Sequence, residues 1–384
     1  MKKIKTLLIT FEFSDRSCGG DGVYAFELAK ILSENGVEMH VIAASPKETR
    51  REVINDNLVI YWQKTIFKPF MRRPLFFNSI RKNYKKIIKE ENIDIIHSND
   101  YAGFLIAGKL PIITTILHPR FCEINNFGLQ SMMNLLGQVM ENKVLKKSDK
   151  IIAISHLTYD LLLSKYPAFK NKTNVIVVGV DINKFKKVKS DIRKKYNIKK
   201  NEILLFSPGG ARQKRKGSEI LFEALSKLKK EYTFKCIITG KDMDIGWGEK
   251  FRKIIKSFPL KDNLILTGEV DYDELPKYYS TSDIVVFPSL FEGFGIPTLE
   301  AMACEKPIIA TKTGEAPYII TNLKNGLLID PGDSEGLYKK IKFLIENRDI
   351  RINLGKNGRK SIEKKYSWEE IVKEYIKVYE ELVK

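Results

Sequence analysis

The chain has 384 residues, of which 43% are apolar, and its 66 basic and 47 acidic residues give a net charge of +19. This length suits two domains of about 180 residues each better than one core. No stretch approaches about 18 uncharged apolar residues, which excludes a spanning helix within this sequence. The basic residues 1–5 imitate a signal peptide, but the apolar run after them is short and acidic residues follow, so we expect a first strand there.

Strand and helix patterns alternate along the first half, which is typical of a doubly wound α/β domain. The expected strands cover residues 6–10, 39–44, 93–96, 112–116, 150–155 and 174–178. The expected helices cover residues 23–33, 82–90, 132–146 and 157–165. The Lys-rich residues 181–201 have little apolar periodicity, so we expect them to hold the connection between two domains.

The second half repeats the alternation. Its expected strands cover residues 203–207, 234–239, 264–267, 284–287, 307–311 and 327–329, and its expected helices cover 218–229, 249–257, 335–346 and, after a capping Ser367, 368–384. We therefore predict an α/β fold of two Rossmann-like doubly wound domains. The predicted boundaries are residues 1–180 for the first domain, 181–366 for the second, and 367–384 for a final helix.

The loop after the first strand is rich in glycine. Gly20 and Gly22, in the run Cys-Gly-Gly-Asp-Gly at 18–22, let backbone N–H groups approach a bound anion closely. The loop does not complete the G-x-G-x-x-G fingerprint, and residues 43–46 after the second strand hold no acidic residue for a ribose. An NAD site is therefore not expected. A tight turn without a ligand stays open as the alternative.

Two histidines are predicted at the carboxyl ends of strands, the edge at which open α/β sheets bind ligands. His118 precedes Pro119, which favours an extended backbone, and its imidazole can hydrogen-bond a hydroxyl group of a ligand. His97 ends the preceding strand and is the weaker candidate. For both, a structural histidine is the alternative.

A basic loop at residues 207–217 leaves the first strand of the second half. Arg212 and Lys216 are its candidate catalytic residues, because fixed cations can stabilise negative charge that grows during a reaction. A solvated basic turn is the alternative for each.

The most informative segment is residues 292–301, Glu-Gly-Phe-Gly-Ile-Pro-Thr-Leu-Glu-Ala. Glu292 is predicted on a loop after a buried strand, and Glu300 in the first turn of a helix that Pro297 helps to start. The helix N-terminus between the two carboxylates is suited to phosphate, and the carboxylates can accept hydrogen bonds from sugar hydroxyls. The predicted donor-binding residues around it are Gly293, Phe294, Gly295, Ile296, Thr298, Leu299 and Glu300. A nucleoside diphosphate-sugar consists of a ribose, a diphosphate and a sugar in this order, so it has hydroxyl groups on both sides of its phosphates.

In this order and spacing, these fragments resemble the retaining glycosyltransferases of family 4, which have the GT-B architecture. The resemblance covers nearly the whole chain and rests above all on the E-x7-E pair, Glu292 and Glu300. The other matching fragments are the Gly-rich loop, Thr-Ile-Leu-His at 115–118, Ile-Ala-Ile-Ser at 152–155, Val-Gly-Val-Asp at 178–181 with Phe185, Lys-Gly at 216–217, and Ser-Asp at 282–283.

The resemblance implies two domains that face a cleft, with the final helix crossing back onto the first domain. It assigns the acceptor to the N-terminal domain and the nucleotide-sugar to the C-terminal domain. It gives Glu292 the sugar hydroxyls, Glu300 the ribose, Lys216 the diphosphate, and the Gly-rich loop the donor phosphate and the acceptor. Arg212 lies closer to Lys216 than the family's arginine does, and a gap-free alignment places Gly210 there.

Retention of anomeric configuration and independence from metal are implied by the resemblance alone. No cofactor and no metal ligand are expected, although Asp242 and Asp244 imitate a metal-binding D-x-D motif. The expected donor is a UDP- or GDP-linked sugar of hexose type. The expected acceptor is a glycan, a lipid-linked molecule or a small molecule. An epimerase or phosphorylase of the same fold, and a basic adaptor without catalysis, are the alternatives.

The four cysteines, at 18, 122, 236 and 304, show no C-x-x-C spacing and are typical of reduced thiols, so we expect a cytoplasmic protein. No nucleic-acid signature accompanies the basic charge. Residues 46–90 hold twelve basic and four acidic residues, interleaved with Phe67, Phe70, Leu75, Phe76 and Phe77. This mixture suits an anionic membrane surface and predicts peripheral docking at the inner face of a membrane. A uniformly Lys-rich proteome is the competing explanation.

Overall fold

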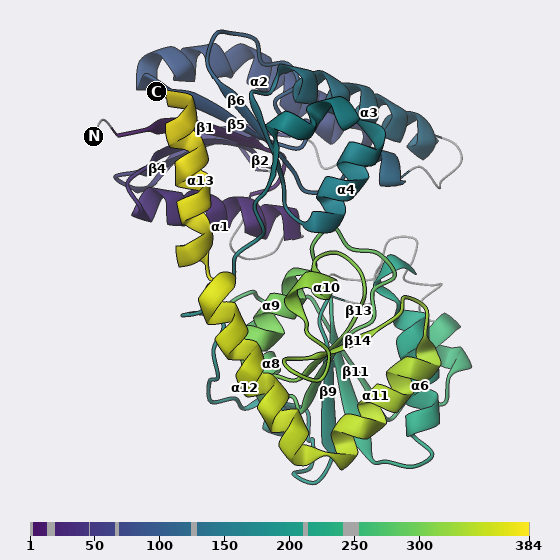
Figure 1. Cartoon of the computed structure of the whole chain (residues 1–384). Coiled ribbons are helices and arrows are strands. Elements are labelled where there is room, and N and C mark those ends of the chain that lie inside the picture. The colour runs from purple at the N-terminus through teal and green to yellow at the C-terminus, as the bar shows by residue number, and fades with distance from the viewer. Residues whose placement is uncertain are drawn as a thin grey trace. The chain divides into compact units, whose positions relative to one another are not determined.

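The computed structural model describes residues 3–13, 20–45, 47–65, 69–123, 129–209, 214–240 and 253–383 (Figure 1). The chain divides into two compact units. The first comprises Met1–Val178 together with Trp368–Lys384, and the second comprises Gly179–Ser367. Each unit is built on one mostly parallel sheet. None of the described helices is long and apolar enough to span a bilayer.

The first sheet has eight strands. Their order is β3 (Arg50–Asn55), β4 (Leu58–Lys64), β2 (Glu38–Ser45), β1 (Lys5–Thr10), β5 (Ile95–Asn99), β6 (Ile112–Ile116), β7 (Lys150–Ala153) and β8 (Thr173–Val175). Only the β3–β4 pair is antiparallel among these. The signal-like start of the chain thus forms β1, which lies between β2 and β5 with its apolar side chains buried.

Helices cover both faces of this sheet (Figure 1). On one face α1 (Gly20–Glu34) packs on α13 (Trp368–Val383), and the hydroxyls of Tyr24 and Tyr375 lie 2.7 Å apart. On the other face α2 (Pro69–Glu91), α3 (Leu129–Lys147) and α4 (His156–Lys165) share one apolar core with the strands. Two short 3-10 turns, η1 (Arg120–Glu123) and η2 (Pro167–Lys172), complete the unit.

Two features of the first unit differ from the sequence prediction. The β3–β4 hairpin was not predicted, because β3 is an edge strand with mostly exposed polar residues and lacks the apolar alternation of a half-buried strand. Helix α2 begins at Pro69 rather than at residue 82. Its Phe76 and Phe77 are buried in the core, so they are not available to a membrane as the sequence pattern suggested.

The second sheet has six parallel strands. Their order is β11 (Leu264–Gly268), β10 (Phe234–Thr239), β9 (Ile203–Ser207), β12 (Ile284–Phe287), β13 (Ile308–Thr311) and β14 (Leu327–Ile329). The helical elements are α5 (Ile192–Lys195), η3 (Lys214–Lys216), α6 (Ser218–Leu228), α8 (Leu275–Thr281), α9 (Ile296–Ala303), α10 (Ala316–Ile319), α11 (Ser334–Glu346) and α12 (Arg348–Lys365). Helices α6 and α11 share the main apolar core with the strands.

The polar helix α12 was also not predicted from the sequence. Its guanidinium at Arg359 donates to the carbonyls of Ala303 and Phe185, each at 2.8 Å, so tertiary contacts hold a helix that has little apolar periodicity. The Lys-rich residues 181–201 pack onto the second unit through buried Phe185 and Ile192. Of the helix expected at 249–257, residues 253–257 are helical and the rest lies outside the described residues.

Candidate active site at the carboxyl edge of the second sheet

The second sheet has a topological switch point between β9 and β12. Strand β9 pairs with β12 on one side and with β10, the next strand along the chain, on the other. The segments that leave β9 and β12 therefore diverge from neighbouring carboxyl ends, where open α/β sheets bind ligands. The first of these segments carries Lys216, and the second carries Glu292.

Close packing fixes the two segments against each other. Gly217 has a φ of +70°, and a Cβ atom there would lie 1.9 Å from the carbonyl oxygen of Pro288. The N–H of Leu290 donates to the carbonyl of Arg215 at 2.6 Å. The glycine after Lys216 is thus required by the approach of the second segment, which explains the Lys-Gly pair in the sequence.

Glu292 lies where these segments meet and is paired with two cations. Lys216 Nζ lies 2.7 Å from Glu292 Oε1, and Arg215 Nη1 lies 3.1 Å from Glu292 Oε2. Burial by itself would raise the pKa of Glu292, but the charges of Lys216 and Arg215 outweigh it and hold the pKa below its ordinary value. The site therefore contains one ionised carboxylate and two cations.

The structure thus brings together two of the predicted catalytic residues, Glu292 and Lys216. Arg215 was missed by the sequence analysis, although its place directly before Lys216 was a signal that could have found it. Arg212 lies outside the described residues, so its role stays a prediction.

Helix α9 starts beside this cluster. Gly295 has a φ of +100°, a left-handed conformation that favours glycine, and the helix follows from Ile296 with Pro297 in its first turn. Glu300 is the fifth helical residue, so it opens the second turn and the expectation of a first-turn position was wrong. The reason is that the helix already begins at Ile296, one residue before Pro297, so four helical residues precede Glu300.

The other predicted donor residues surround this helix start. Gly293 and Ile296 are half-buried, whereas Phe294 and Leu299 are buried. Thr298 is also buried, and within the described part of the chain its Oγ1 has no hydrogen-bond partner. A buried polar atom of this kind costs free energy unless a ligand or water satisfies it, so it marks a place for a polar ligand at the N-terminus of α9.

Glu300 is buried and held by a tyrosine from α8. The Tyr279 hydroxyl donates to Glu300 Oε2 at 2.6 Å. Burial, and then the charge of Glu300, raise the pKa of Tyr279 well above its ordinary value, so this phenol stays a donor. Tyr279 was not singled out from the sequence, since a buried aromatic in a helix is more often a core residue.

The predicted residues of the first unit lie at the carboxyl edge of its own sheet. His118 follows β6 and is half-buried. Gly20 and Gly22 lie in the first turn of α1 rather than in a loop, because the helix begins at Gly20. Cys18 and Gly19 of the Gly-rich run lie outside the described residues.

His97 is a core residue. Its Nδ1 lies 2.7 Å from the Tyr379 hydroxyl and its Nε2 lies 2.7 Å from Thr115 Oγ1. Burial lowers the pKa of this imidazole to about 3, so it stays neutral. Its hydrogen bonds join β5 and β6 to α13. These contacts therefore support a structural role for His97.

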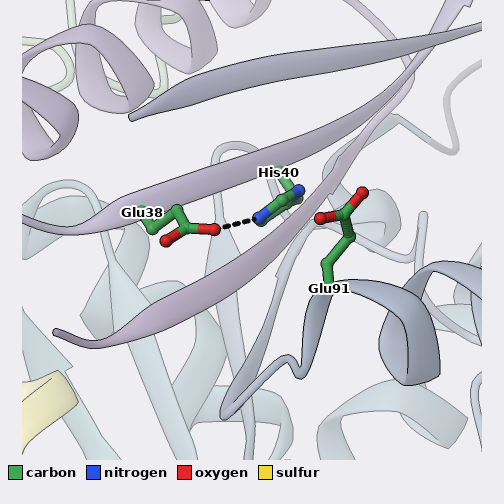
Figure 2. A group of neighbouring side chains, drawn as sticks. All are labelled: Glu38, His40 and Glu91. Atoms are coloured by element: carbon green, nitrogen blue, oxygen red, sulfur yellow. Dashed lines mark hydrogen bonds and ion pairs between the residues drawn. The ribbon is translucent and has the colours of Figure 1, made fainter. Parts of the chain in front are cut away.

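One described group of side chains has the composition of a metal site. Glu38, His40 and Glu91 offer ligand atoms that all lie within 4.8 Å of one another, and His40 lies between the two carboxylates (Figure 2). Glu38 Oε1 lies 3.0 Å from His40 Nε2 and 2.9 Å from Lys5 Nζ. The Tyr61 hydroxyl donates to Glu91 Oε1 at 2.6 Å.

These contacts indicate a structural cluster of hydrogen bonds and ion pairs rather than a cation site. The ammonium of Lys5 neutralises the carboxylate that a metal would need, and Tyr61 occupies the other carboxylate. Burial, followed by the hydrogen bond to Glu91, raises the pKa of Tyr61 to about 12, so its proton stays in place. The cluster joins β2, β4 and the end of α2. Asp242 and Asp244 lie outside the described residues.

Two family models match the chain. The model described as glycosyl transferases group 1 matches residues 188–361, and the model described as glycosyltransferase family 4 matches residues 18–184. An uncharacterised glycosyltransferase of Methanocaldococcus jannaschii is 32% identical over 382 residues, which cover 95% of each chain.

Solved structures share the fold. The sucrose-phosphate synthase of Thermosynechococcus elongatus matches with a TM-score of 0.85 and 22% identity over 99% of each chain. The Anabaena protein HepE, in complex with UDP and glucose, matches with a TM-score of 0.77 and 20% identity, over 99% of this chain and 100% of that one.

Proposed function

Because the chain belongs to the group 1 glycosyltransferases of family 4, with the GT-B fold, we propose that it moves a hexose from a nucleoside diphosphate-sugar to a hydroxyl acceptor. The proposal includes retention of the anomeric configuration and independence from metal. The observation that carries it is the cluster of Lys216, Arg215 and Glu292 beside the N-terminus of α9.

The two cations take the role of stabilising the leaving group. When the bond between the sugar C1 and the phosphate oxygen breaks, negative charge grows on the diphosphate. Lys216 and Arg215 are held at a fixed position by Glu292, so they can meet this charge without reorganisation. The N-terminus of α9 and the Thr298 hydroxyl add hydrogen-bond donors for the phosphates.

The two carboxylates take the hydroxyl groups of the donor. Glu300, oriented by Tyr279, is assigned to the ribose, and Glu292 is assigned to the sugar. A carboxylate can accept about four hydrogen bonds, so Glu292 can accept from sugar hydroxyls while it still holds Lys216 and Arg215. A nucleoside diphosphate, either UDP or GDP, fits this order of groups. The solved HepE complex holds UDP and glucose, which supports a donor of this class.

In the proposed reaction one bond is exchanged for another. The bond from C1 to the diphosphate oxygen breaks, a bond from C1 to the acceptor oxygen forms, and the acceptor's proton passes to the departing diphosphate. The first unit is assigned to the acceptor, with His118 and the α1 N-terminus at Gly20 and Gly22 as its binding groups. The acceptor is a glycan, a lipid-linked molecule or a small molecule.

A thermal-shift screen tests the proposal. Bound nucleotide stabilises the folded chain by RT ln(1 + [L]/Kd), so a UDP- or GDP-sugar at about 100 times its Kd should add about 2.7 kcal/mol. Product analysis with the stabilising donor then separates the alternatives, since an epimerase returns an altered nucleotide-sugar and a phosphorylase releases a sugar phosphate. Absence of any shift with UDP-, GDP- and ADP-sugars would contradict the proposed donor class.

A further inference from the structure

The outer face of α2 is strongly basic. Arg81, Lys82, Lys85, Lys86 and Lys89 are all exposed, and their spacing places them on one side of the helix. The opposite side of α2 packs into the core through Phe76, Phe77, Ile80, Tyr84 and Ile87. Among the described side chains of 75–91, the one exposed acid is Glu90, whose Oε1 lies 3.8 Å from Lys86 Nζ. The exposed side of α2 therefore carries a local excess of positive charge.

Helix α3 exposes apolar side chains. Leu135, Leu136 and Val139 are 61%, 51% and 49% exposed and lie on one side of the helix. The exposed residues that continue this side are Lys143, Lys146 and Lys147. Three neighbouring apolar side chains in water are unfavourable unless something covers them, so they indicate an interaction surface.

The two helices belong to one face of the first unit. Both pack on the same apolar core and cover the same side of the first sheet (Figure 1). The segment between β5 and β6 joins them: the Tyr84 hydroxyl donates to the Ala107 carbonyl at 3.3 Å, and Lys147 Nζ donates to the Ile106 carbonyl at 3.0 Å. Lys109 is exposed on the same segment. The basic and the apolar side chains can thus meet one partner.

We propose that this face docks the first unit on an anionic membrane and that the acceptor is lipid-linked. The α2–α3 surface is defined as Arg81, Lys82, Lys85, Lys86, Lys89, Leu135, Leu136 and Val139. Cations near anionic headgroups attract the protein over about a Debye length, and apolar side chains then enter the boundary between headgroups and acyl chains. The lipid-linked acceptor rests on the proposed function, whereas the docking itself does not.

A membrane fits this surface because anionic headgroups complement the basic side chains of α2 and acyl chains can cover the exposed apolar side chains of α3. A nucleic acid would use the basic face of α2 but would leave Leu135, Leu136 and Val139 in water. An anionic bilayer can contact the basic side chains of α2 and also cover the apolar side chains of α3. Helix α3 follows β6, so its N-terminal half lies towards the carboxyl edge of the sheet, where His118 is found. A lipid headgroup held at α3 would therefore be close to the groups assigned to the acceptor.

Vesicle sedimentation of the full chain tests the docking. Wild type should bind vesicles of equal parts phosphatidylglycerol and phosphatidylcholine, and should bind pure phosphatidylcholine far more weakly. Replacing Arg81, Lys82, Lys85 and Lys86 with Gln should weaken binding by about 10²-fold or more, because each cation near the surface contributes separately. Replacing Leu135, Leu136 and Val139 with Gln should remove the apolar contribution to vesicle binding. The remaining binding is electrostatic, so about 0.5 M salt should abolish it by screening the charges.

The second unit supplies a matched control. Lys356, Lys360, Lys364 and Lys365 are exposed on α12, and their replacement with Gln removes the same charge from a helix of the same kind. This variant should bind vesicles nearly as wild type does. An equal loss in both quadruple variants would overturn the proposal in favour of a uniformly basic chain. Failure of wild type to sediment with anionic vesicles at low salt, or a preference for double-stranded DNA over vesicles, would overturn it as well.

Donor hydrolysis without vesicles keeps the two proposals apart. Each folded variant should hydrolyse the donor like wild type, because no residue of the α2–α3 surface belongs to the second unit. Wild type that binds vesicles and cleaves no donor contradicts the proposed function alone.

Discussion

Lys216 Nζ lies 2.7 Å from Glu292 Oε1, although the two residues are 76 positions apart in the sequence. The pair joins the segments that leave two neighbouring strands, β9 and β12. Since Glu292 also holds Arg215, its carboxylate fixes two cations at the carboxyl edge of the second sheet.

Lys216→Ala should lower the turnover number by about 10²-fold or more, as expected for the loss of one preorganised charge that stabilises the transition state. Arg215→Ala should lower it less, because this side chain is more exposed. Lys227→Ala is the control, since its ion pair with Glu335 lies on the surface. Steady-state kinetics check the order. EDTA should leave wild type active, and inhibition that Mn²⁺ reverses would contradict the metal-independent mechanism.

Variants of the two carboxylates should differ in how tightly they bind the nucleoside diphosphate. Glu300→Ala removes the proposed ribose ligand, so it should weaken binding of the free nucleoside diphosphate. Glu292→Ala should keep nucleotide binding and lower turnover. Calorimetric titration with UDP and GDP measures the first effect, and initial rates measure the second. Wild-type binding and activity in both variants would show that these carboxylates do not hold the donor.

Gly217 offers a test of the local geometry. A side chain there meets both an unfavourable positive φ and the Pro288 carbonyl, so Gly217→Ala should destabilise the second unit by several kcal/mol and abolish transfer. Gly209→Ala is the matched control, because Gly209 has a φ of +62° but no atom of the described residues lies within 4 Å of the added Cβ. It should cost only about 1–2 kcal/mol. Denaturant unfolding of both variants compares the two, and equal losses would show that the contact with Pro288 is unimportant.

Glu141 should make the stability of the first unit depend on pH. This carboxyl is fully buried, and burial raises its pKa to about 7. The folded state therefore keeps a proton that the unfolded chain loses above about pH 4.5, so stability falls as pH rises from there to about 7, by about 3 kcal/mol in total.

Glu141→Gln should remove this slope and raise the melting temperature most at neutral pH. Glu34→Gln, at an exposed position of α1, is the control and should leave the slope unchanged. A melting profile of Glu141→Gln that runs parallel to wild type from pH 5 to pH 7 would contradict the assignment.

The sequence by itself determined the alternation of strands and helices, the GT-B fold and the position of the glycosyltransferase motif. Buried parallel strands are recognisable because they are short apolar runs; β6, β9, β10, β12 and β14 match their predicted bounds. The loop and helix around Glu292 and Glu300 were recognisable because Gly295 and Pro297 have conformational preferences that act locally.

Only the tertiary structure decided which charges meet and which apolar side chains are buried. Nothing local joins Arg215 to Glu292 or Tyr279 to Glu300, because these contacts depend on strand order. The same holds for burial: Phe76 and Phe77 of the basic segment belong to the core, whereas Leu135 and Leu136 of α3 face the solvent. A one-dimensional pattern gives the period of an amphipathic element, but the face that is covered depends on the elements that the rest of the chain packs against it.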